Sequence, residues 1–575
     1  MSASRSALAP AAGASSAAGG VARARTLWLA LGAIALAAFA YQLRLGVYTD
    51  PLWLMICCER WLDGQTAYVD FLENSPPAAI LVYLPPVVVA RWLGVAREPL
   101  FVAYVLVVVG LCVGLCARLL SSAWKAGRIG APTLLGAAAV LLLAPDYAFG
   151  QRDHLALALA LPLLGVFALR AEASEVGRWA AAAAGLAAAL ACAIRPHYAL
   201  AFAPALAYVA WRRGARPLLA CLELYVGAGA CAGAAVASFV FFPRYFDAML
   251  PITTAVYVAD NVGATAMLIT PIAAAWAMLA AALAAWRVRA PLNAFADVAA
   301  LAATGAAAAY LIQLKGYAYH GYFAVALMFI AVTILAAADL RRLGFWIFAP
   351  IANVAATLSA LGYFGVSFRP DALLAVAAAL AIWAIAAPQR LRPRAYVTSA
   401  ASALACAALG LTAFAFHLEW PGDPLFVREA QTLGPHPKIA LVSDLGDLAQ
   451  PLVSRVHGRW TQRVISLLLT DHVDRRLERG SLGPDDRRRL EALKTLDLDM
   501  FLHDMERGQP DAVVVEEGWA ARHFNDPRVG AFLAGYRRTA SAKTTRDGGD
   551  DSVAFYVRAS ASPGGASAAS DRVSP

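Results

Sequence analysis

Charged residues are scarce in this chain. Only 15% of its 575 residues are Asp, Glu, Lys or Arg, against about a quarter in soluble domains. Hydrophobic residues make up 60% of the sequence, and the mean hydropathy is +0.60. A single soluble domain is excluded, because many windows reach the roughly 20 apolar residues that cross a bilayer as a helix. The chain is therefore predicted to be a polytopic α-helical membrane protein.

Cysteine patterns and the common cofactor motifs are also lacking. The eight cysteines form neither metal-ligand spacings nor a disulfide framework, and the region beyond residue 417 has none. No GxGxxG or GK[ST] motif follows a predicted strand. The first apolar run has no convincing cleavage site, so it is expected to remain as an anchor. Residues 1–25 before it are predicted to be a disordered cytoplasmic leader.

Fourteen apolar segments lie within residues 26–416, and one of them, 78–93, is doubtful as a membrane span. As a helix, the segment 78–93 would rise about 24 Å, against a hydrocarbon core of about 30 Å. It also contains Pro85-Pro86, and prolines inside a helix break or kink it. The other thirteen segments are predicted to be membrane spans: 26–43, 100–120, 132–149, 155–170, 179–194, 198–211, 218–242, 263–286, 294–313, 321–338, 343–363, 371–388 and 395–416.

The distribution of basic residues favours the same arrangement. If the N-terminus is cytoplasmic and 78–93 lies on the membrane surface, most Arg and Lys residues fall in inner loops. Counting 78–93 as a span would reverse every later loop. The net charge of +9 then reflects membrane topology, and nucleic acid is not an expected partner. The C-terminus is placed outside.

Beyond the transmembrane domain at 26–416, a small external α/β domain is predicted at 417–558 and a disordered tail at 559–575. The stretches "KIALVS", "DAVVVEE" and "SVAFYVR" are typical of buried strands. Pro484 and Gly508 bracket a predicted helix between them. The turn "SDLGDL" matches no phosphate-binding pattern and receives no role.

The first external loop, 44–99, is predicted to carry juxtamembrane helices. Its residues 51–62 mix apolar and charged side chains in the pattern of an amphipathic helix. Trp53 and Trp61 would anchor that helix in the lipid interface.

Two acidic residues on the expected outer loops are candidates for chemistry, and each has a plain structural alternative. Asp50 precedes Pro51, which is the arrangement of a helix N-cap followed by the first helical position. Asp153 could simply lie in the first turn of the next helix, where a carboxylate suits the helix dipole, with Arg152 as its ion-pair partner. The chemical alternative is that a carboxylate accepts the proton of a reacting hydroxyl group.

Basic and imidazole side chains lie at the outer ends of other spans. Arg195 and His197 flank Pro196 after an Ala-rich span, and Lys315 and His320 follow a later one. For Lys315 and His320, the alternative is that the side chains snorkel to the lipid headgroups. Together with two carboxylates, these groups suit a transfer from a lipid phosphate, because cations stabilise charge on the departing phosphate.

In their order and sidedness, these motifs resemble those of the GT-C glycosyltransferases, which use polyprenyl-phosphate sugars. The protein O-mannosyltransferases and lipid A aminoarabinose transferases are the most similar in style. The resemblance covers residues 26–340 by organisation. It rests on Asp50 and on "RWLDGQTAYVDFLENSPPAAILVYLPP", "FGQRDHL", "IRPH" and "KGYAYH". It implies an inverting transfer of a sugar to a hydroxyl of a lipid, glycan or protein, on the extracytoplasmic face of a bacterial inner membrane.

The resemblance also implies residue roles. Asp50 would be the general base, and Asp153 would position the acceptor or the sugar, or ligate a metal. Glu73 and His154 would support the substrate site. Many relatives carry a paired Asp-Glu where this chain has Asp50 followed by Pro51, so no cofactor is assigned, and a divalent metal such as Mg²⁺ or Mn²⁺ stays an open alternative. The donor would be bound by four further side chains: Arg195, His197, Lys315 and His320.

Other functions remain as alternatives. A flippase or transporter of lipid-linked sugars would use intramembrane charges as a transport path, although no paired repeats are visible in the sequence. A surface-polysaccharide polymerase would be expected to rely on a large late loop, whereas the charges here concentrate in the first loop. A scaffold whose external domain binds a partner is a further alternative.

The topology makes a direct prediction. Reporter fusions joined after residue 154 and after residue 320 are expected to report an extracytoplasmic position, because both lie in outer loops when 78–93 does not span. A fusion after Arg213 is expected to report a cytosolic one. Cytosolic signals at 154 and 320 would contradict the arrangement.

Overall fold

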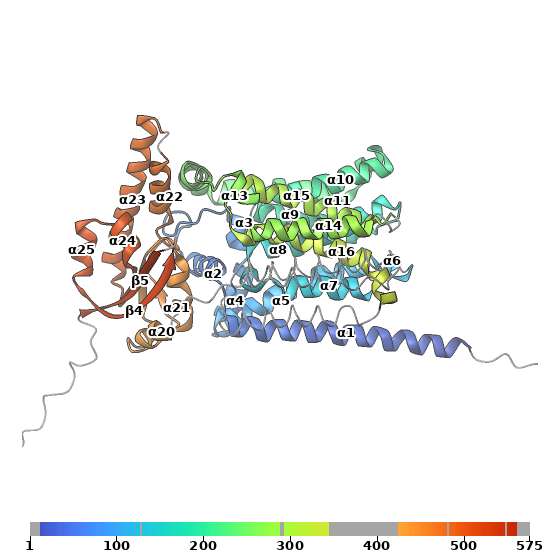
Figure 1. Ribbon diagram of the computed structural model, residues 1–575, viewed down its shortest axis with the longest axis horizontal. Helices are drawn as coiled ribbons and strands as arrows, with labels where there is room; N and C mark the ends of the chain where they lie inside the picture. The colour runs from blue at the N-terminus through green and yellow to red at the C-terminus, as the bar shows by residue number, and fades with distance from the viewer. Residues whose placement is uncertain are drawn as a thin grey trace, which may run out of the picture.

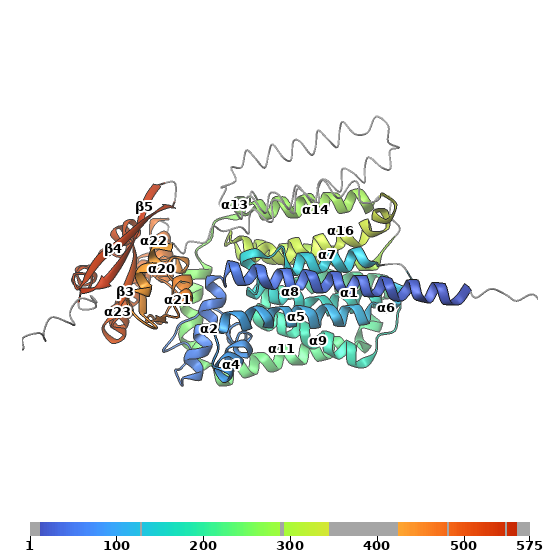
Figure 2. The same ribbon diagram turned by 90° about the horizontal axis from the view of Figure 1, so that it is seen from below.

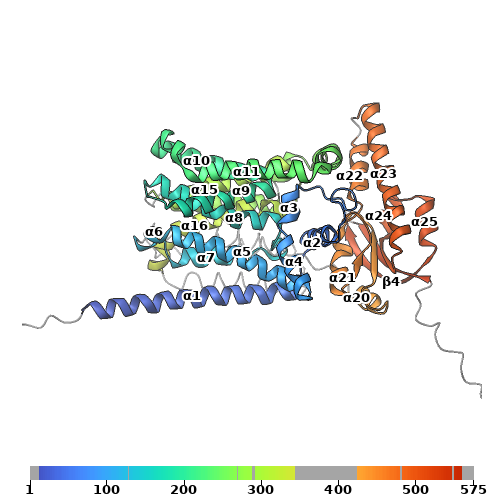
Figure 3. The same cartoon turned by 180° about the vertical axis from the view of Figure 1, so that it is seen from behind.

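The computed structural model describes residues 12–126, 129–268, 270–287, 292–343, 424–479, 482–546 and 549–559. Residues up to 343 form a bundle of helices, and residues 424–559 form a sheet domain at one end of it (Figure 1). Two further views also show the sheet domain at this end of the bundle (Figures 2 and 3). The predicted spans at 343–363, 371–388 and 395–416, and the tail beyond residue 559, lie outside the described residues.

Within the described residues, six helices are long and apolar enough to cross a membrane, and shorter apolar helices accompany them. The bundle helices coincide with ten of the predicted spans, and the total of thirteen stays a prediction. They are α1 (Ala12–Leu45), α5 (Arg97–Leu119), α7 (Ala131–Leu142), α8 (Arg152–Ala171), α9 (Arg178–Ile194), α10 (Ala199–Arg213), α11 (Leu222–Phe241), α14 (Pro271–Arg287), α15 (Ala294–Gln313) and α16 (Tyr322–Leu343).

Shorter elements connect these helices. The loop 44–99 contributes three helices, and two π-helical turns flank a short helix after α11. The connecting elements are α2 (Thr49–Leu62), α3 (Pro77–Leu81), α4 (Leu84–Leu93), α6 (Ser121–Lys125), η1 (Asp146–Ala148), η2 (Pro196–Tyr198), η3 (Arg216–Ala220), η4 (Tyr245–Met249), α12 (Leu250–Thr253), η5 (Thr254–Val258), α13 (Ala264–Leu268) and η6 (Ala318–Gly321).

Helix α1 begins at Ala12, inside the segment predicted to be a disordered leader. The residues before the apolar run are rich in Ala, which has the highest helix propensity, and the helix continues into that run without a break. The leader prediction is corrected for residues 12–25.

The doubtful segment 78–93 forms two short helices instead of a span. Pro85 and Pro86 lie in the first turn of α4, where the missing N–H of proline costs no helical hydrogen bond. Because this segment does not cross the bundle, the starts of α2 and α8 meet at the same end. Asp50 and Arg152 are hydrogen-bonded there, as expected if 78–93 does not span the membrane.

The sheet domain has five strands in the order β2-β1-β3-β5-β4. Strand β1 runs parallel to β2 and β3, and β5 runs antiparallel to β3 and β4. The strands are β1 (Lys438–Val442), β2 (Arg459–Trp460), β3 (Ala512–Glu516), β4 (Tyr536–Arg546) and β5 (Gly549–Arg558). The helices are α20 (Pro424–Gln431), η8 (Gly446–Leu448), α21 (Gln450–Arg455), α22 (Leu468–Glu478), α23 (Pro484–Gly508), α24 (Glu517–His523) and α25 (Pro527–Leu533).

The structure contains the three predicted strands as β1, β3 and β5, and the predicted helix as α23. Strand β3 is buried along its whole length, as expected of an apolar strand between two neighbours. The sequence analysis did not predict β2 or β4. The first has only two residues, and the second is a mostly polar strand at the sheet edge.

Helix α2 is buried rather than interfacial. Trp53 is only 1% exposed, and its Nε1 donates a hydrogen bond to Glu73 Oε2 at 2.8 Å. The helix packs against α21 of the sheet domain and against α3 and α4. The prediction that Trp53 anchors the helix in lipid is wrong, because the sheet domain and the neighbouring helices bury it. Trp61, near the end of α2, remains 38% exposed.

Glycines allow the closest helix crossings in the bundle. A Cβ atom at Gly185 of α9 would lie 2.3 Å from the backbone oxygen of Glu223 in α11. A Cβ atom at Gly305 of α15 would lie 2.0 Å from the backbone oxygen of Leu200 in α10. Small residues let helix backbones approach in this way within membranes.

This packing predicts that Gly185→Ala lowers stability by about 1–3 kcal/mol, because the added methyl group forces the two backbones apart. Gly229→Ala in α11 is the matched control, since no heavy atom lies within 4 Å of its Cβ position. Thermal unfolding in detergent compares the two variants. Equal melting temperatures would contradict the packing.

Candidate active site

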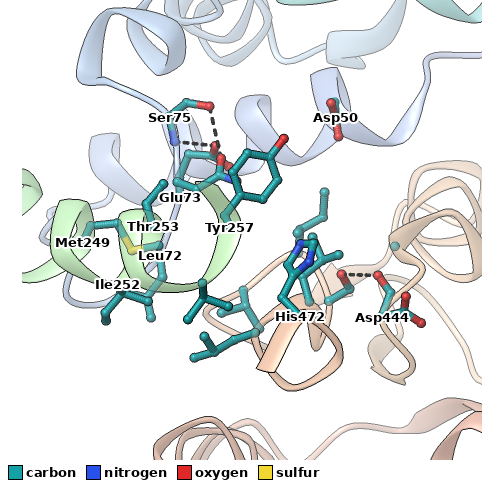
Figure 4. A pocket seen from close by; sticks show the side chains of 18 of the residues that line it. Asp50, Leu72, Glu73, Ser75, Met249, Ile252, Thr253, Tyr257, Asp444 and His472 are labelled. Atoms are coloured by element: carbon teal, nitrogen blue, oxygen red, sulfur yellow. Dashed lines mark hydrogen bonds between the residues drawn. The ribbon is translucent and has the colours of Figure 1, made fainter. Parts of the chain in front are cut away.

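A cavity of about 360 Å³ lies between the bundle and the sheet domain. Figure 4 shows side chains from both parts around it. Both π-helical turns contribute, and such turns are frequent at functional sites. The bundle side includes residues 48–50, 72–76, 152, 194–197, 249, 252, 253, 256, 257, 317 and 319, and the domain side includes residues 444–447, 464–466, 468, 469, 472, 496, 497 and 500.

Arg152, the first residue of α8, ties the bundle side together. Its Nη2 donates to Asp50 Oδ2 at 2.9 Å, and its Nη1 donates to Glu73 Oε1 at 3.4 Å and to Ser75 Oγ. Glu73 is further fixed by the backbone N–H of Ser75 at 2.9 Å. Arg152 was expected to form an ion pair with its neighbour Asp153. In the structure it forms ion pairs with Asp50 and Glu73 of the loop 44–99 instead.

Asp50 lies in the first turn of α2, where Tyr48 is the N-cap residue. The N-cap interpretation of Asp50 is therefore corrected. Its side chain is 22% exposed and lines the cavity. Asp50 is thus a carboxylate that is held by Arg152 and is still open to the cavity.

Asp153 is fully buried and does not line the cavity. It accepts a hydrogen bond from the hydroxyl of Tyr198, and its Oδ2 lies 3.5 Å from Arg195 Nη2. Arg195 also donates to Gln313 Oε1 at 3.3 Å, and its side chain lines the cavity. Asp153 therefore reaches the cavity only through Arg195, as a positioning residue.

Of the other imidazole and amine candidates, His197 is the one that lines the described cavity. Burial lowers the pKa of His197 to about 3, and the charge of Arg195 acts in the same direction. The ring is therefore neutral at physiological pH and can orient a substrate without adding charge. Lys315 instead donates to the backbone oxygens of Tyr257 and Asp260.

His154 and His320 lie behind the cavity wall. Both ring nitrogens of His154 are engaged: Nδ1 accepts from the Gly150 N–H at 2.9 Å, and Nε2 lies 2.7 Å from the Leu141 oxygen. His320 is buried and packs edge-on against Tyr319, which lines the cavity, with ring centroids 4.4 Å apart. None of Lys315, His154 and His320 lines the described cavity. For His154 this is the place of a supporting residue, as expected, and the donor contacts expected of Lys315 and His320 stay a prediction.

The sheet domain supplies residues to which the sequence analysis gave no role. The turn "SDLGDL" follows β1 and brings Asp444, Gly446 and Asp447 to the cavity. Tyr48 donates its hydroxyl to Asp447 Oδ2 at 2.7 Å. Burial raises the pKa of Asp447, and the nearby Asp50 carboxylate acts in the same direction. An acidic turn at the carboxyl end of a parallel strand was the available signal, since ligands bind there in α/β sheets.

No group of three or more His, Cys, Asp or Glu side chains is placed to hold a metal ion in the part of the chain that the structure describes. The two carboxylates on the bundle side, Asp50 and Glu73, share the guanidinium of Arg152. That guanidinium supplies the positive charge between them, so the geometry does not fit a bound metal, and no step below uses one.

Two solved structures resemble the whole chain. They are crystal structures of ArnT from Cupriavidus metallidurans, one in the apo state and one bound to undecaprenyl phosphate. The TM-scores are 0.53 and 0.52 and the sequence identities 17% and 16%. The matches cover 92% and 91% of this chain and 98% and 97% of the ArnT chains. The chain has the fold of ArnT.

This likeness confirms the expected fold, a mostly helical membrane bundle with a small sheet domain. The part of this chain that the match leaves uncovered has fewer residues than the sheet domain. Part of the sheet domain therefore has a counterpart in the ArnT fold. No protein-family model matches the sequence, and no curated protein matches it.

Asp497 of α23 lines the domain side of the cavity and makes stability depend on pH. It is 1% exposed and accepts hydrogen bonds from the backbone N–H and hydroxyl of Thr470, at 3.0 and 2.6 Å. Burial raises its pKa to about 6. The folded chain thus holds this proton more tightly than the unfolded chain, whose Asp pKa is about 4, and stability falls as pH rises from about 4 to 6.

Between pH 4 and pH 7, the Asp497 carboxyl is expected to lower the free energy of unfolding of the wild type by up to about 3 kcal/mol. Asp497→Asn is expected to abolish this part of the pH dependence. The amide oxygen can still accept the Thr470 hydrogen bonds. Melting temperatures of both proteins, recorded across this range, check the prediction. Parallel pH profiles for the wild type and the variant would refute it.

Proposed function

We propose that the protein is a membrane glycosyltransferase, which moves a sugar from a polyprenyl-phosphate donor to an acceptor hydroxyl. The observation that carries the proposal is a cavity at the end of apolar helices, with the open carboxylate of Asp50 and the guanidinium of Arg195 on the same wall. The fold supports it, since ArnT has been crystallised with undecaprenyl phosphate, a lipid phosphate of the donor class.

The proposed reaction is a direct displacement. The acceptor oxygen forms a bond to the anomeric carbon of the sugar, and the bond from that carbon to the phosphate oxygen breaks. The bonding electron pair leaves with the phosphate, and the acceptor proton passes to the carboxylate of Asp50. A single displacement inverts the anomeric centre. The product is the glycosylated acceptor, and the lipid phosphate is released.

Arg195 supplies the positive charge for the departing phosphate. It lines the cavity, and its guanidinium is held in place by Asp153 and Gln313. A preorganised cation of this kind stabilises developing negative charge without having to reorganise. Arg152 keeps Asp50 in position on the same wall.

The apolar part of the cavity suits the lipid chain of the donor. Leu72, Met249 and Ile252 lie beside the polar wall in Figure 4, and Ile194 and Val256 line the same cavity. The charge distribution of the loops supports an extracytoplasmic position of the cavity and the sheet domain, at a bacterial inner membrane. The acceptor, whether lipid, glycan or protein, presents its hydroxyl group to the polar wall.

Asp50→Asn is expected to lower transfer at least a hundred-fold, because the amide cannot accept the acceptor proton, and positioned bases contribute about 10²–10⁴-fold. The amide still presents an oxygen to Arg152, so folding is expected to be preserved. Purified protein in nanodiscs is incubated with radiolabelled polyprenyl-phosphate sugars and membrane extract as the acceptor source, and labelled product is counted.

Asp63→Asn is the matched control. Asp63 belongs to the same loop, is about half exposed and pairs with Arg91 away from the cavity, so near wild-type transfer is expected. Near wild-type turnover by Asp50→Asn would remove Asp50 from the mechanism. Donor movement across vesicle membranes without loss of the sugar would instead favour a flippase and overturn the proposed function.

A further inference from the structure

His472 of α22 connects the sheet domain with the bundle at the edge of the cavity. Its Nδ1 lies 2.6 Å from Oδ2 of Asp260, which follows η5 in the bundle, and both residues are buried. The ring also packs edge-on against Tyr257, with centroids 5.4 Å apart. Lys315 holds the segment 257–260 in place by donating to the backbone oxygens of Tyr257 and Asp260. The imidazole is therefore held rigidly.

Two arginines accompany His472 at the Asp260 carboxylate. Arg479 Nη2 lies 2.8 Å from Asp260 Oδ1, and Arg475 Nε lies 3.4 Å from Oδ2. Burial alone would raise the pKa of Asp260, but the hydrogen bond from His472 and the arginine charges outweigh it and lower that pKa. An ionised carboxylate can only accept, so Nδ1 donates to it. Nδ1 of His472 also lies 3.2 Å from Arg475 Nη2, so this ring nitrogen is already engaged and Nε2 is the one left to meet a ligand.

Nε2 of His472 has no hydrogen-bond partner in the structure, although it is buried. The side chain lines the cavity, as Figure 4 shows, on the domain side. A buried polar atom without a partner costs about 1–3 kcal/mol, and one that lines a cavity is placed to be completed by a ligand there. The bundle side of the same cavity carries a second unpartnered imidazole nitrogen, Nε2 of His197.

We propose that Nε2 of His472 forms a hydrogen bond with a sugar hydroxyl in the cavity, so that the sheet domain binds part of the substrate on which Asp50 acts. The inference rests on the proposed function, because it assigns a substrate contact to the same cavity. A hydroxyl group is the matching partner, since it can donate or accept a hydrogen bond and carries no charge. The hydroxyl belongs to the sugar of the donor or to a glycan acceptor.

Two substitutions separate this role from a purely structural one. In His472→Asn, the amide nitrogen takes the place of Nδ1 and keeps the contact to Asp260, but Nε2 is lost. In His472→Gln, the longer amide reaches the place of Nε2, but the contact to Asp260 is lost. A substrate contact predicts that the Asn variant loses more activity, whereas a simple tie between the domains predicts that the Gln variant does.

The experiment uses the full chain in nanodiscs, with donor and acceptor concentrations varied separately. His472→Asn is expected to lower kcat/KM about ten-fold or more, with an unchanged melting temperature and unchanged binding of undecaprenyl phosphate that bears no sugar. His472→Gln is expected to retain more kcat/KM and to melt at a lower temperature. A raised KM for the donor assigns the hydroxyl to the donor sugar, and a raised KM for the acceptor assigns it to the acceptor.

His503→Asn is the control, because His503 is an exposed histidine on α23 of the same domain. Wild-type kcat/KM in His472→Asn, or a larger loss of activity in His472→Gln, would overturn the inference and leave the proposed function standing. If the wild type releases no polyprenyl phosphate from any donor, the proposed function fails, and the inference fails with it.

Discussion

The guanidinium of Arg152 is the contact on which the rest of the site depends. It is buried at the start of α8 and binds two carboxylates and a hydroxyl from the first external loop. Removing one partner from a buried ion pair costs about 3–5 kcal/mol, because the other charge stays buried without compensation. Arg152 therefore fixes the loop that bears Asp50 and Glu73 to the bundle. The adjacent residue, Asp153, fixes Arg195 from the same turn of α8, so one helix start positions both the carboxylate and the cation of the proposed reaction.

The sheet domain forms the other side of the same site. It is attached to the bundle at separate points, each of which is a hydrogen bond between segments far apart in the sequence. Arg60 donates to the Trp460 oxygen at 2.8 Å, Ser454 donates to Glu98 at 2.7 Å, and the Leu72 N–H donates to the Arg463 oxygen at 2.6 Å. These contacts hold the sheet domain against the bundle and so fix the two sides of the cavity relative to each other. A domain that only protected the outer surface would not need to supply Asp444, Asp447 and His472 to the cavity lining.

Much of this architecture could be predicted from the sequence, because it follows from periodicity and composition. The length of 78–93 and its two prolines predicted a segment that does not cross the bundle, and the structure agrees. The strands around residues 440, 514 and 555 carry continuous apolar runs, and Pro484 and Gly508 mark the ends of a helix that the structure contains. The gathering of Asp50, Glu73, Arg195 and His197 at one end of the bundle also followed from topology alone.

The partners of individual side chains could not be predicted in the same way. Arg152 bonds to Asp50, a residue 102 positions earlier, instead of its neighbour Asp153, because tertiary packing decides the choice. Lys315 and His320 had the right chemistry for a phosphate, yet neither lines the described cavity. Trp53 looked like a lipid anchor because the sequence does not reveal that the sheet domain and the neighbouring helices bury α2. His472 carries no local motif, and its importance emerges only from the contact with Asp260.

The central claim is that the bundle and the sheet domain enclose one substrate cavity around Asp50 and Arg195. The most direct measurement is a cryo-electron microscopy structure of the full chain with undecaprenyl phosphate. The account predicts density for the phosphate inside the cavity, within hydrogen-bonding distance of the Arg195 guanidinium, and for the lipid chain along Met249 and Ile252. Phosphate density at the opposite end of the bundle, or on the outer surface of the sheet domain, would contradict it.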